Sequence, residues 1–199
     1  MTSQNAYDMV VFTAPSGAGK TTVVRHLLKT YPDLLSFSTS ATTRERRKHE
    51  IDGKDYYFLS RENFKKRVKD GQFIEWEEVY EDQYYGTLQS EVKRILATGK
   101  KIVFDIEVYG AENIKQKYGD RCLVIFVKPP SFRELVQRLT NRNTETPKSF
   151  KKRIIRIKKE MLFVNSFDEV LLNDKLEDTL RNAEKLIEEK LLRRDDSRD

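Results

Sequence analysis

The chain has 199 residues, of which 38% are hydrophobic and 35% are charged. This length favours one domain with a substantial core, and the short apolar runs exclude a membrane-spanning helix. The formal net charge of +6 suits a polyanionic partner, but charge alone does not distinguish nucleic acid, anionic lipid and phosphorylated small molecules.

Short apolar runs alternate along the chain with segments of helical periodicity, a pattern typical of a parallel sheet covered by helices. The core strands are expected at residues 9–13, 35–39, 101–105, 122–127 and 169–172. The helices between them are expected at residues 20–29, 88–97, 109–117, 131–140 and 176–192. We therefore predict an α/β fold in which helices flank a parallel sheet.

Two stretches depart from this alternation. Residues 42–86 are rich in charged and aromatic side chains, and short runs at 56–59 and 73–79 indicate a small β-rich insertion. Residues 138–156 are strongly basic, and a helix is expected to begin at Pro147. Both stretches are candidates for moving parts.

The N-terminal sequence and the cysteine count bear on the location of the protein. The first residues, MTSQNAYDMVVF, lack the basic flank and the long apolar core of a secretory signal. Cys122 is the single cysteine, which excludes an internal disulfide, and it is expected to be a buried thiol. We therefore expect a cytoplasmic protein.

Residues 14–22 read APSGAGKTT and lie directly after an apolar run and before a helical pattern. Backbone N–H groups of such a loop converge on a phosphate at the positive end of the helix, and glycines permit the close approach. Lys20 would supply charge to the β- and γ-phosphates, and the Thr21 hydroxyl would bind Mg²⁺. The expected phosphate-binding residues are Ala14, Pro15, Ser16, Gly17, Ala18, Gly19, Lys20, Thr21 and Thr22. Because GTPases, ATPases and kinases share this loop, it predicts triphosphate binding without naming the acceptor.

The insertion carries a second set of motifs. It contains T-T-R-x-x-R-x-x-E-x-x-G-x-D-Y-x-F, followed by FIEW at 73–76 and YYGT at 84–87, and DIEVYGA stands at 105–111. Together with the phosphate loop, this set resembles guanylate kinase, a family of P-loop nucleoside monophosphate kinases, over about residues 9–192. The positions that depart from the usual family pattern are Ala14, Glu107, Tyr109 and Asn143.

The resemblance implies a single domain over residues 7–190, built on a P-loop NTPase-type parallel sheet. The expected parts are a core of residues 7–39, 92–130 and 157–190, a GMP-binding insertion of residues 40–91, and a helical lid of residues 131–156. The implied reaction is phosphoryl transfer from ATP to GMP, and to dGMP, with Mg²⁺ as the cofactor.

Seven residues of the insertion match the GMP-binding positions of the family. The positions that hold the GMP phosphate are matched by Arg44, Arg47, Tyr56 and Tyr85, and those that read the guanine edge by Ser40, Glu75 and Thr87. Guanine presents N1–H and N2–H₂ side by side to one carboxylate, whereas adenine would set its N1 lone pair against Glu75. Without the resemblance, the run at 44–48 also fits a solvated or nucleic-acid-binding basic patch, and Glu75 fits a surface carboxylate.

Asp105 ends an apolar strand, where nucleotide-binding sheets expose a carboxylate to the site. The resemblance places Asp105 near the acceptor base and the reaction centre, where it would accept from guanine N2, orient water around Mg²⁺, or do both. Glu107 is a weaker candidate beside it. Since the attacking GMP phosphate is already anionic at neutral pH, the reaction requires no general base.

Three arginines, Arg138, Arg142 and Arg153, lie in the segment that matches the lid. The resemblance implies that Arg142 and Arg153 are catalytic and close over the phosphates, and that Arg138 binds ATP. Each arginine also fits a solvated helix face. Asn173 matches a family motif near the ATP adenine, and a loop cap accounts for it equally well.

Two other functions fit parts of the sequence. A noncatalytic guanylate-kinase-like module would bind a protein through the insertion, but it would need neither Lys20, Thr21 nor the lid arginines. A basic nucleic-acid-binding ATPase would show hydrolysis stimulated by nucleic acid. We favour the enzyme, with ATP and GMP as partners, no nucleic acid and no membrane. Its oligomeric state is left open, a homodimer included.

Overall fold

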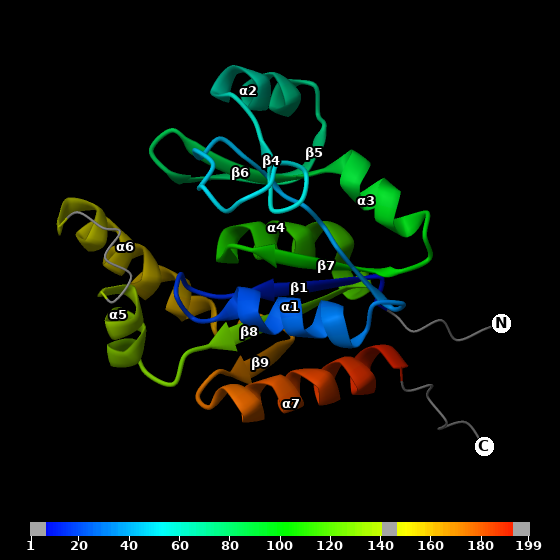
Figure 1. Ribbon diagram of the computed structural model, residues 1–199, viewed down its shortest axis with the longest axis vertical. Coiled ribbons are helices and arrows are strands. Elements are labelled where there is room, and N and C mark those ends of the chain that lie inside the picture. The colour runs from blue at the N-terminus through cyan, green and yellow to red at the C-terminus, as the bar shows by residue number, and fades with distance from the viewer. Residues whose placement is uncertain (1–6, 141–146, 193–199) are drawn as a thin grey trace.

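The structure is a computed structural model that describes residues 7–140 and 147–192. Its larger sheet has five strands in the order β2-β7-β1-β8-β9, and the paired neighbours run parallel (Figure 1). These strands are β1 Met9–Thr13, β2 Leu35–Phe37, β7 Lys101–Ile106, β8 Cys122–Lys128 and β9 Glu169–Leu172. The predicted parallel α/β core is thereby confirmed.

Strand β2 ends at Phe37, two residues before its predicted end. The backbone N–H of Ser38 still donates to Val103 O at 2.9 Å, but that of Thr39 donates to the Glu91 carboxylate at 3.1 Å. A side-chain acceptor therefore replaces the neighbouring strand at this point, and the chain leaves the sheet for the insertion.

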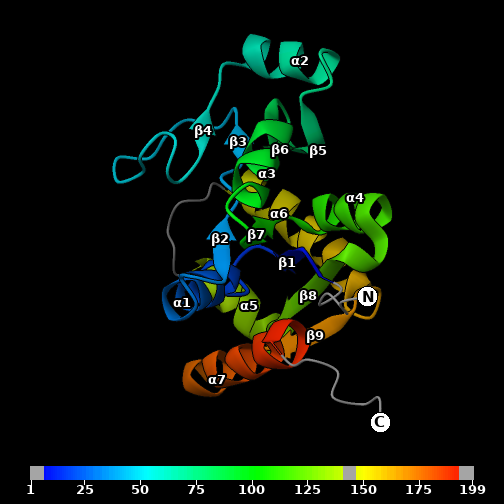
Figure 2. The same ribbon diagram turned by 90° about the vertical axis from the view of Figure 1, so that its right-hand side faces the viewer.

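Helices cover both faces of the larger sheet (Figure 2). Along β1, Val10 and Phe12 belong to one buried apolar cluster, whereas Met9 and Val11 belong to another. The first cluster includes residues of α1 Lys20–Thr30, α5 Phe132–Thr140 and α7 Leu176–Ile187, and the second includes residues of α3 Gln89–Leu96 and α4 Val108–Tyr118. This two-sided burial explains why the core strands appear in the sequence as continuous apolar runs. Cys122 is buried in the second cluster, as predicted.

The insertion forms a smaller sheet with the strand order β4-β3-β6-β5. Its strands are β3 Ala41–Thr42, β4 Tyr57–Phe58, β5 Phe73–Tyr80 and β6 Gln83–Leu88. Helix α2 Arg61–Lys69 lies at the outer end of this sheet and is absent from the sequence prediction (Figure 1). Its start is marked by Ser60, whose hydroxyl accepts from the Asn63 N–H at 3.2 Å.

Two helices occupy the predicted lid. Helix α5 follows Ser131, whose hydroxyl accepts from the Glu134 N–H at 3.1 Å and so caps the helix. Helix α6 Pro147–Glu160 is held to the core by the fully buried Ile157, and a 3-10 turn follows it at Met161–Phe163. Another 3-10 turn, Gly119–Arg121, follows α4, and a π-helical turn, Glu188–Leu192, follows α7. No helix within residues 7–140 and 147–192 combines the length and apolar character that crossing a bilayer requires.

Phe64 joins α2 to the smaller sheet. It is fully buried, and its ring centroid lies 4.5 Å from that of Phe73. Phe64→Ala removes a buried ring and leaves a cavity, so the free energy of unfolding should fall by about 3–5 kcal/mol in urea denaturation. Leu162→Ala is the control, because this side chain is 79% exposed, and it should change that free energy by less than about 0.5 kcal/mol. A loss below about 1 kcal/mol for Phe64→Ala would contradict the role of α2 in this core.

Candidate active site

The phosphate loop joins β1 to α1 and is braced by Asn173. The Asn173 side-chain N–H donates to Ala18 O at 2.6 Å in a buried contact. Gly19 has a φ of 93°, and a Cβ there would lie 2.2 Å from Asn173 Nδ2, so this position requires glycine. The loop leads directly into the first turn of α1, where free backbone N–H groups and the helix dipole favour an anion.

Lys20 and Thr21 converge on Asp105. The pairing of β1 with β7 sets Phe12 opposite Asp105, which brings the end of β7 beside the loop. Lys20 Nζ contacts one Asp105 oxygen and donates to Ile106 O at 3.0 Å, and the Thr21 hydroxyl donates to the other Asp105 oxygen at 2.6 Å. Burial alone would lower the pKa of Lys20, but the negative charges of Asp105 and nearby carboxylates outweigh it and raise that pKa. Lys20 is therefore held in its charged form.

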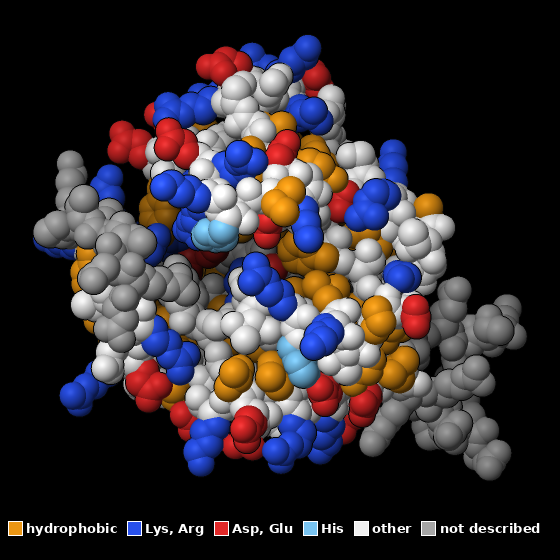
Figure 3. Space-filling view, in the orientation of Figure 1, with side chains coloured by type: hydrophobic (Ala, Val, Ile, Leu, Met, Phe, Trp, Pro, Cys, Tyr) orange, Lys and Arg blue, Asp and Glu red, His pale blue; other side chains and the backbone are white. Residues whose placement is uncertain are grey.

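A cavity of about 210 Å³ lies between the phosphate loop and the smaller sheet. The predicted site residues on its wall are the loop residues Ala14 to Thr22, Ser40, Tyr56, Glu75, Tyr85 and Asp105. An adjoining cavity of about 160 Å³ shares Tyr56 and Tyr85 with it and adds Arg44, Arg47 and Arg153. Lys and Arg side chains stand beside the hollow between α1 and the smaller sheet (Figure 3). The structure thus brings most of the predicted donor and acceptor residues to one place.

Glu50 holds the Arg44 side chain and the backbone of Arg47 in place. Arg44 donates to both Glu50 oxygens, at 2.7 and 3.1 Å, and the backbone N–H of Arg47 donates to the same carboxylate at 2.8 Å. The Arg44 guanidinium also lies 5.4 Å from the centroid of the Tyr56 ring. Burial would raise the pKa of Glu50, but these hydrogen bonds outweigh it and lower that pKa. Glu50 therefore stays ionised and fixes the Arg44 side chain beside the cavity.

Glu75 is a buried carboxylate whose partner is a hydroxyl. Thr87 lies opposite it across β5 and β6 and donates its hydroxyl to Glu75 Oε1 at 2.7 Å. Burial raises the pKa of Glu75 to about 7. A Cβ built on Gly110 of α4 would lie 2.9 Å from Glu75 Oε2, so the glycine leaves room for this oxygen. The arrangement leaves a buried carboxyl group on the cavity wall with acceptor capacity for a ligand.

Some predicted residues lie away from these walls. Thr87 is fully buried behind Glu75, and the Arg138 guanidinium donates to Glu134 on its own helix at 3.4 Å. Asn173 donates to Ala18 O of the phosphate loop, which fits the alternative that this residue caps a loop. Arg142 lies outside the described residues. The roles assigned to these four residues stay predictions, as do those of the residues on the cavity walls.

Several residues around the cavities have no predicted role. They are Glu50, Glu77, Tyr80, Arg156 and Glu160. Glu50 is the glutamate of the T-T-R-x-x-R-x-x-E motif, so its place in the sequence was visible although its contact was not. Arg156 stands three residues after Arg153, a spacing that puts both on one face of a helix. Burial raises the pKa of Glu160, which pairs with Arg156.

A phosphate loop that faces a buried glutamate across one cavity, with two arginines on the wall of the adjoining cavity, defines a phosphotransferase of the nucleoside monophosphate kinase class. A family model described as guanylate kinase matches residues 7–190. The chain therefore belongs to the guanylate kinase family.

Individual relatives cover most of the chain. It is 45% identical over 179 residues to a guanylate kinase of Porphyromonas gingivalis, covering 90% of this chain and 95% of that protein. Over 169 residues it is 47% identical to a guanylate kinase of Bacteroides thetaiotaomicron, covering 85% and 82%. The crystal structure of guanylate kinase from Anaplasma phagocytophilum superposes with a TM-score of 0.77 at 27% identity, covering 96% and 89%.

Asn173→Ala tests the brace under the phosphate loop. The change leaves the buried Ala18 carbonyl without this donor, so the free energy of unfolding should fall by about 1–3 kcal/mol. Urea denaturation measures the loss, and Asp174→Ala at the exposed neighbouring position is the control, expected within about 0.5 kcal/mol of the wild type. Equal effects of the two substitutions would contradict the bracing role.

Proposed function

We propose that this protein transfers the γ-phosphoryl group of ATP to GMP, giving ADP and GDP, and that dGMP is a second acceptor. The observation that carries this proposal is the buried Glu75 carboxylate facing the phosphate loop across one cavity. Guanine offers two adjacent N–H donors to such a carboxylate, and adenine does not. The phosphate loop and the acceptor cavity would hold donor and acceptor side by side.

The donor would lie on the phosphate loop with its β- and γ-phosphates beside Lys20. Mg²⁺ binds hard oxygen ligands and usually takes one or two from the protein and the rest from phosphates and water. The Thr21 hydroxyl and the Asp105 carboxylate, 2.6 Å apart, fit that donor set and would hold the ion. When bound, the ion would neutralise charge on the β- and γ-phosphates. Asp105 would also orient Lys20, and the Lys20 ammonium group would stabilise negative charge on the transferring phosphoryl group.

The acceptor phosphate would lie among Arg44, Arg47, Tyr56 and Tyr85. Arg44 is already oriented by Glu50, so little side-chain entropy remains to be lost when the phosphate binds. The GMP phosphate is anionic at neutral pH and attacks without a general base, so alignment and charge neutralisation would supply the catalysis. Ser40 and Asp105, on the same cavity wall as Glu75, are the further candidates for contact with the base.

Residues 40–91 would act as the GMP-binding insertion and residues 131–156 as the lid. Arg153 lines the acceptor-side cavity and would reach the transferring phosphoryl group when the lid closes. Arg138, Arg142 and Asn173 keep their proposed places on the ATP side. A single domain over residues 7–190, a cytoplasmic location and a homodimer stay predictions.

A coupled assay of ADP release tests the proposed reaction. With ATP and Mg²⁺ present, GMP and dGMP should support turnover, whereas AMP, CMP and UMP should be poorer by at least about 100-fold in kcat/KM, because a buried group of the site would stay unpaired. ADP release without any acceptor would indicate an ATPase. Equal turnover with AMP would show that Glu75 does not select guanine over adenine.

The pH dependence of GMP use tests Glu75 directly. Its raised pKa of about 7 means that the free protein holds a proton there at low pH, and the protonated carboxyl cannot accept from both guanine donors. The value of kcat/KM for GMP should therefore fall about tenfold from pH 8 to pH 6.

Glu75→Gln is the control for this pH profile. The amide does not titrate, so the variant should have a lower kcat/KM for GMP and should lose most of its fall at low pH. The GMP phosphate titrates equally in both proteins and cancels from the comparison. Parallel pH profiles of the two proteins would assign the effect to another group.

A further inference from the structure

Arg156 connects helix α6 to strand β5 inside the protein. Its guanidinium donates to Glu77 Oε1 at 2.7 Å, to Val79 O at 2.8 Å and to Glu160 Oε1 at 2.6 Å. Two of these three acceptors belong to β5, and the third belongs to α6. The Arg156 side chain is 15% exposed, so the connection is largely shielded from water.

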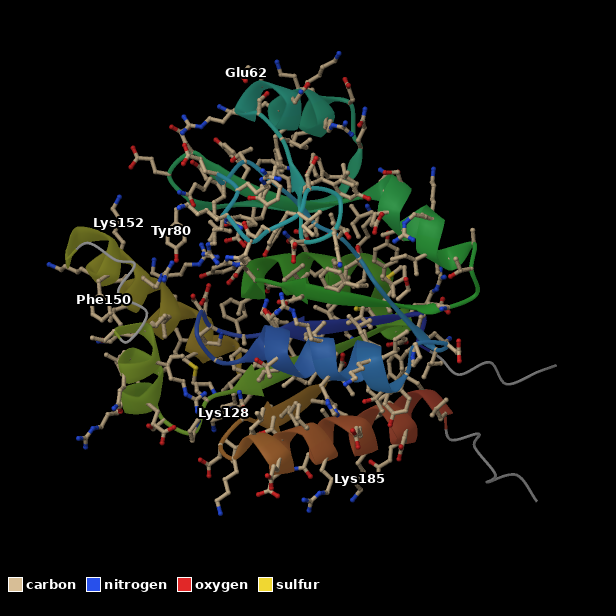
Figure 4. All side chains as sticks on the ribbon, in the orientation of Figure 1. Glu62, Tyr80, Lys128, Phe150, Lys152 and Lys185 are labelled. Carbon is tan, nitrogen blue, oxygen red and sulfur yellow. The ribbon has the colours of Figure 1, made fainter. Side chains whose placement is uncertain are left out.

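Further contacts join α6 to β5 and to the turn that follows it. Arg153 Nε donates to the Tyr80 hydroxyl at 3.2 Å, and the guanidinium groups of Arg153 and Arg156 lie 5.7 and 5.9 Å from the centroid of the Tyr80 ring. Lys152 pairs with Glu81 at 3.5 Å, but both side chains are largely exposed. Tyr80 of β5 and Lys152 of α6 lie next to each other where the two elements meet (Figure 4). We call these contacts the α6–β5 bridge.

The bridge joins two parts of the proposed reaction site. Strand β5 carries Glu75, the proposed base reader, two residues before Glu77, so both side chains point to the same face of the sheet. Both line the main cavity. Helix α6 carries Arg153, which would reach the transferring phosphoryl group, one turn before Arg156. A movement of β5 on binding the base would therefore be passed to α6, and so to Arg153, through the buried Arg156 as well as through Tyr80.

The contacts of the bridge differ in burial, and the buried ones contribute most to holding α6 against β5. Exposed ion pairs such as Lys152–Glu81 contribute about 0–1 kcal/mol, whereas removing one partner of a buried pair leaves an uncompensated charge. Glu77 and Glu160 are 17% and 1% exposed, and each has a second carboxylate oxygen that is buried without a hydrogen-bond partner among the described residues. Both carboxylates therefore depend on Arg156. The buried contacts of Arg156 therefore hold α6 and β5 in a fixed relative position.

We propose that Arg156 is a positioning residue that couples the binding of GMP to the placement of Arg153 over the donor phosphates. The inference rests on the proposed function, because it assigns the guanine base to Glu75 of β5 and the transferring phosphoryl group to Arg153 of α6. It predicts that each nucleotide tightens the binding of the other, and that this mutual effect depends on Arg156.

The experiment compares Arg156→Met with Lys152→Met. The dissociation constant of GMP is measured by calorimetry with and without a nonhydrolysable ATP analogue and Mg²⁺. In the wild type and in Lys152→Met, the analogue should tighten GMP binding at least about fivefold. In Arg156→Met, the ratio of the GMP dissociation constant without the analogue to that with it should fall to within about twofold of one. The dissociation constant of GMP alone should stay within about threefold of the wild-type value. A merely structural role would weaken the binding of each nucleotide alone and leave the ratio unchanged.

Glu77→Gln provides a second variant that keeps Arg156 and weakens its contact with β5. It should lower the same ratio, and combining it with Arg156→Met should lower the ratio no further, since both changes break one link. An unchanged ratio in Arg156→Met and Glu77→Gln, or an equal loss in Lys152→Met, would overturn the coupling. A wild-type protein that turns over ATP and GMP while showing no coupling would also overturn it. A wild-type protein without GMP-dependent turnover would instead refute the proposed function.

Discussion

The parallel register of β1 with β7 is the constraint on which the site depends. It sets Phe12 opposite Asp105, so the loop after β1 leaves the sheet beside the carboxylate near the end of β7. Lys20 and Thr21 then reach the two oxygens of that carboxylate from the first turn of α1. A register shifted by one residue would turn Asp105 to the opposite face of the sheet and lose both contacts. The packing of the apolar clusters on the two faces thus fixes the polar geometry at the edge of the sheet.

Three carboxylates at the cavities show how burial and partners set their chemistry. Asp105 is paired with the Lys20 ammonium group, and Glu50 is paired with the Arg44 guanidinium. Glu75 has the neutral Thr87 hydroxyl as its side-chain hydrogen-bond donor, and burial leaves its pKa near 7. A carboxylate held by a cation orients that cation, whereas a carboxylate held by a hydroxyl keeps most of its acceptor capacity for a ligand. The difference suits Glu75 to a neutral base edge and the other two to organising positive charge around phosphates.

The parts of the fold and site that sequence could predict are those with local signals. The core strands appear as apolar runs because both faces are buried, and the phosphate loop has fixed spacing at a strand–helix junction. Helix α2 gives a weaker signal, since one buried side chain, Phe64, stands among polar residues. The roles of Arg156 and Asn173 depend on contacts to residues 79 and 155 positions away in the chain. No pattern along one segment predicts such a pairing, because tertiary packing creates it.

Polar contacts tie both ends of the smaller sheet, at β4 and at β5, to other elements. At one end, the buried Glu91 carboxylate accepts from the Thr39 N–H and the Tyr57 hydroxyl, where the chain enters and leaves the insertion. At the other end, Arg156 connects β5 to α6, and α3 and α6 stand on opposite sides of the smaller sheet (Figure 1). Glu91 lies where the chain enters and leaves the insertion, so it limits how far the smaller sheet can separate from the core. Arg156 instead joins two elements that are distant in sequence. Of the two ties, the one at Arg156 is therefore placed to transmit a change at β5 to helix α6.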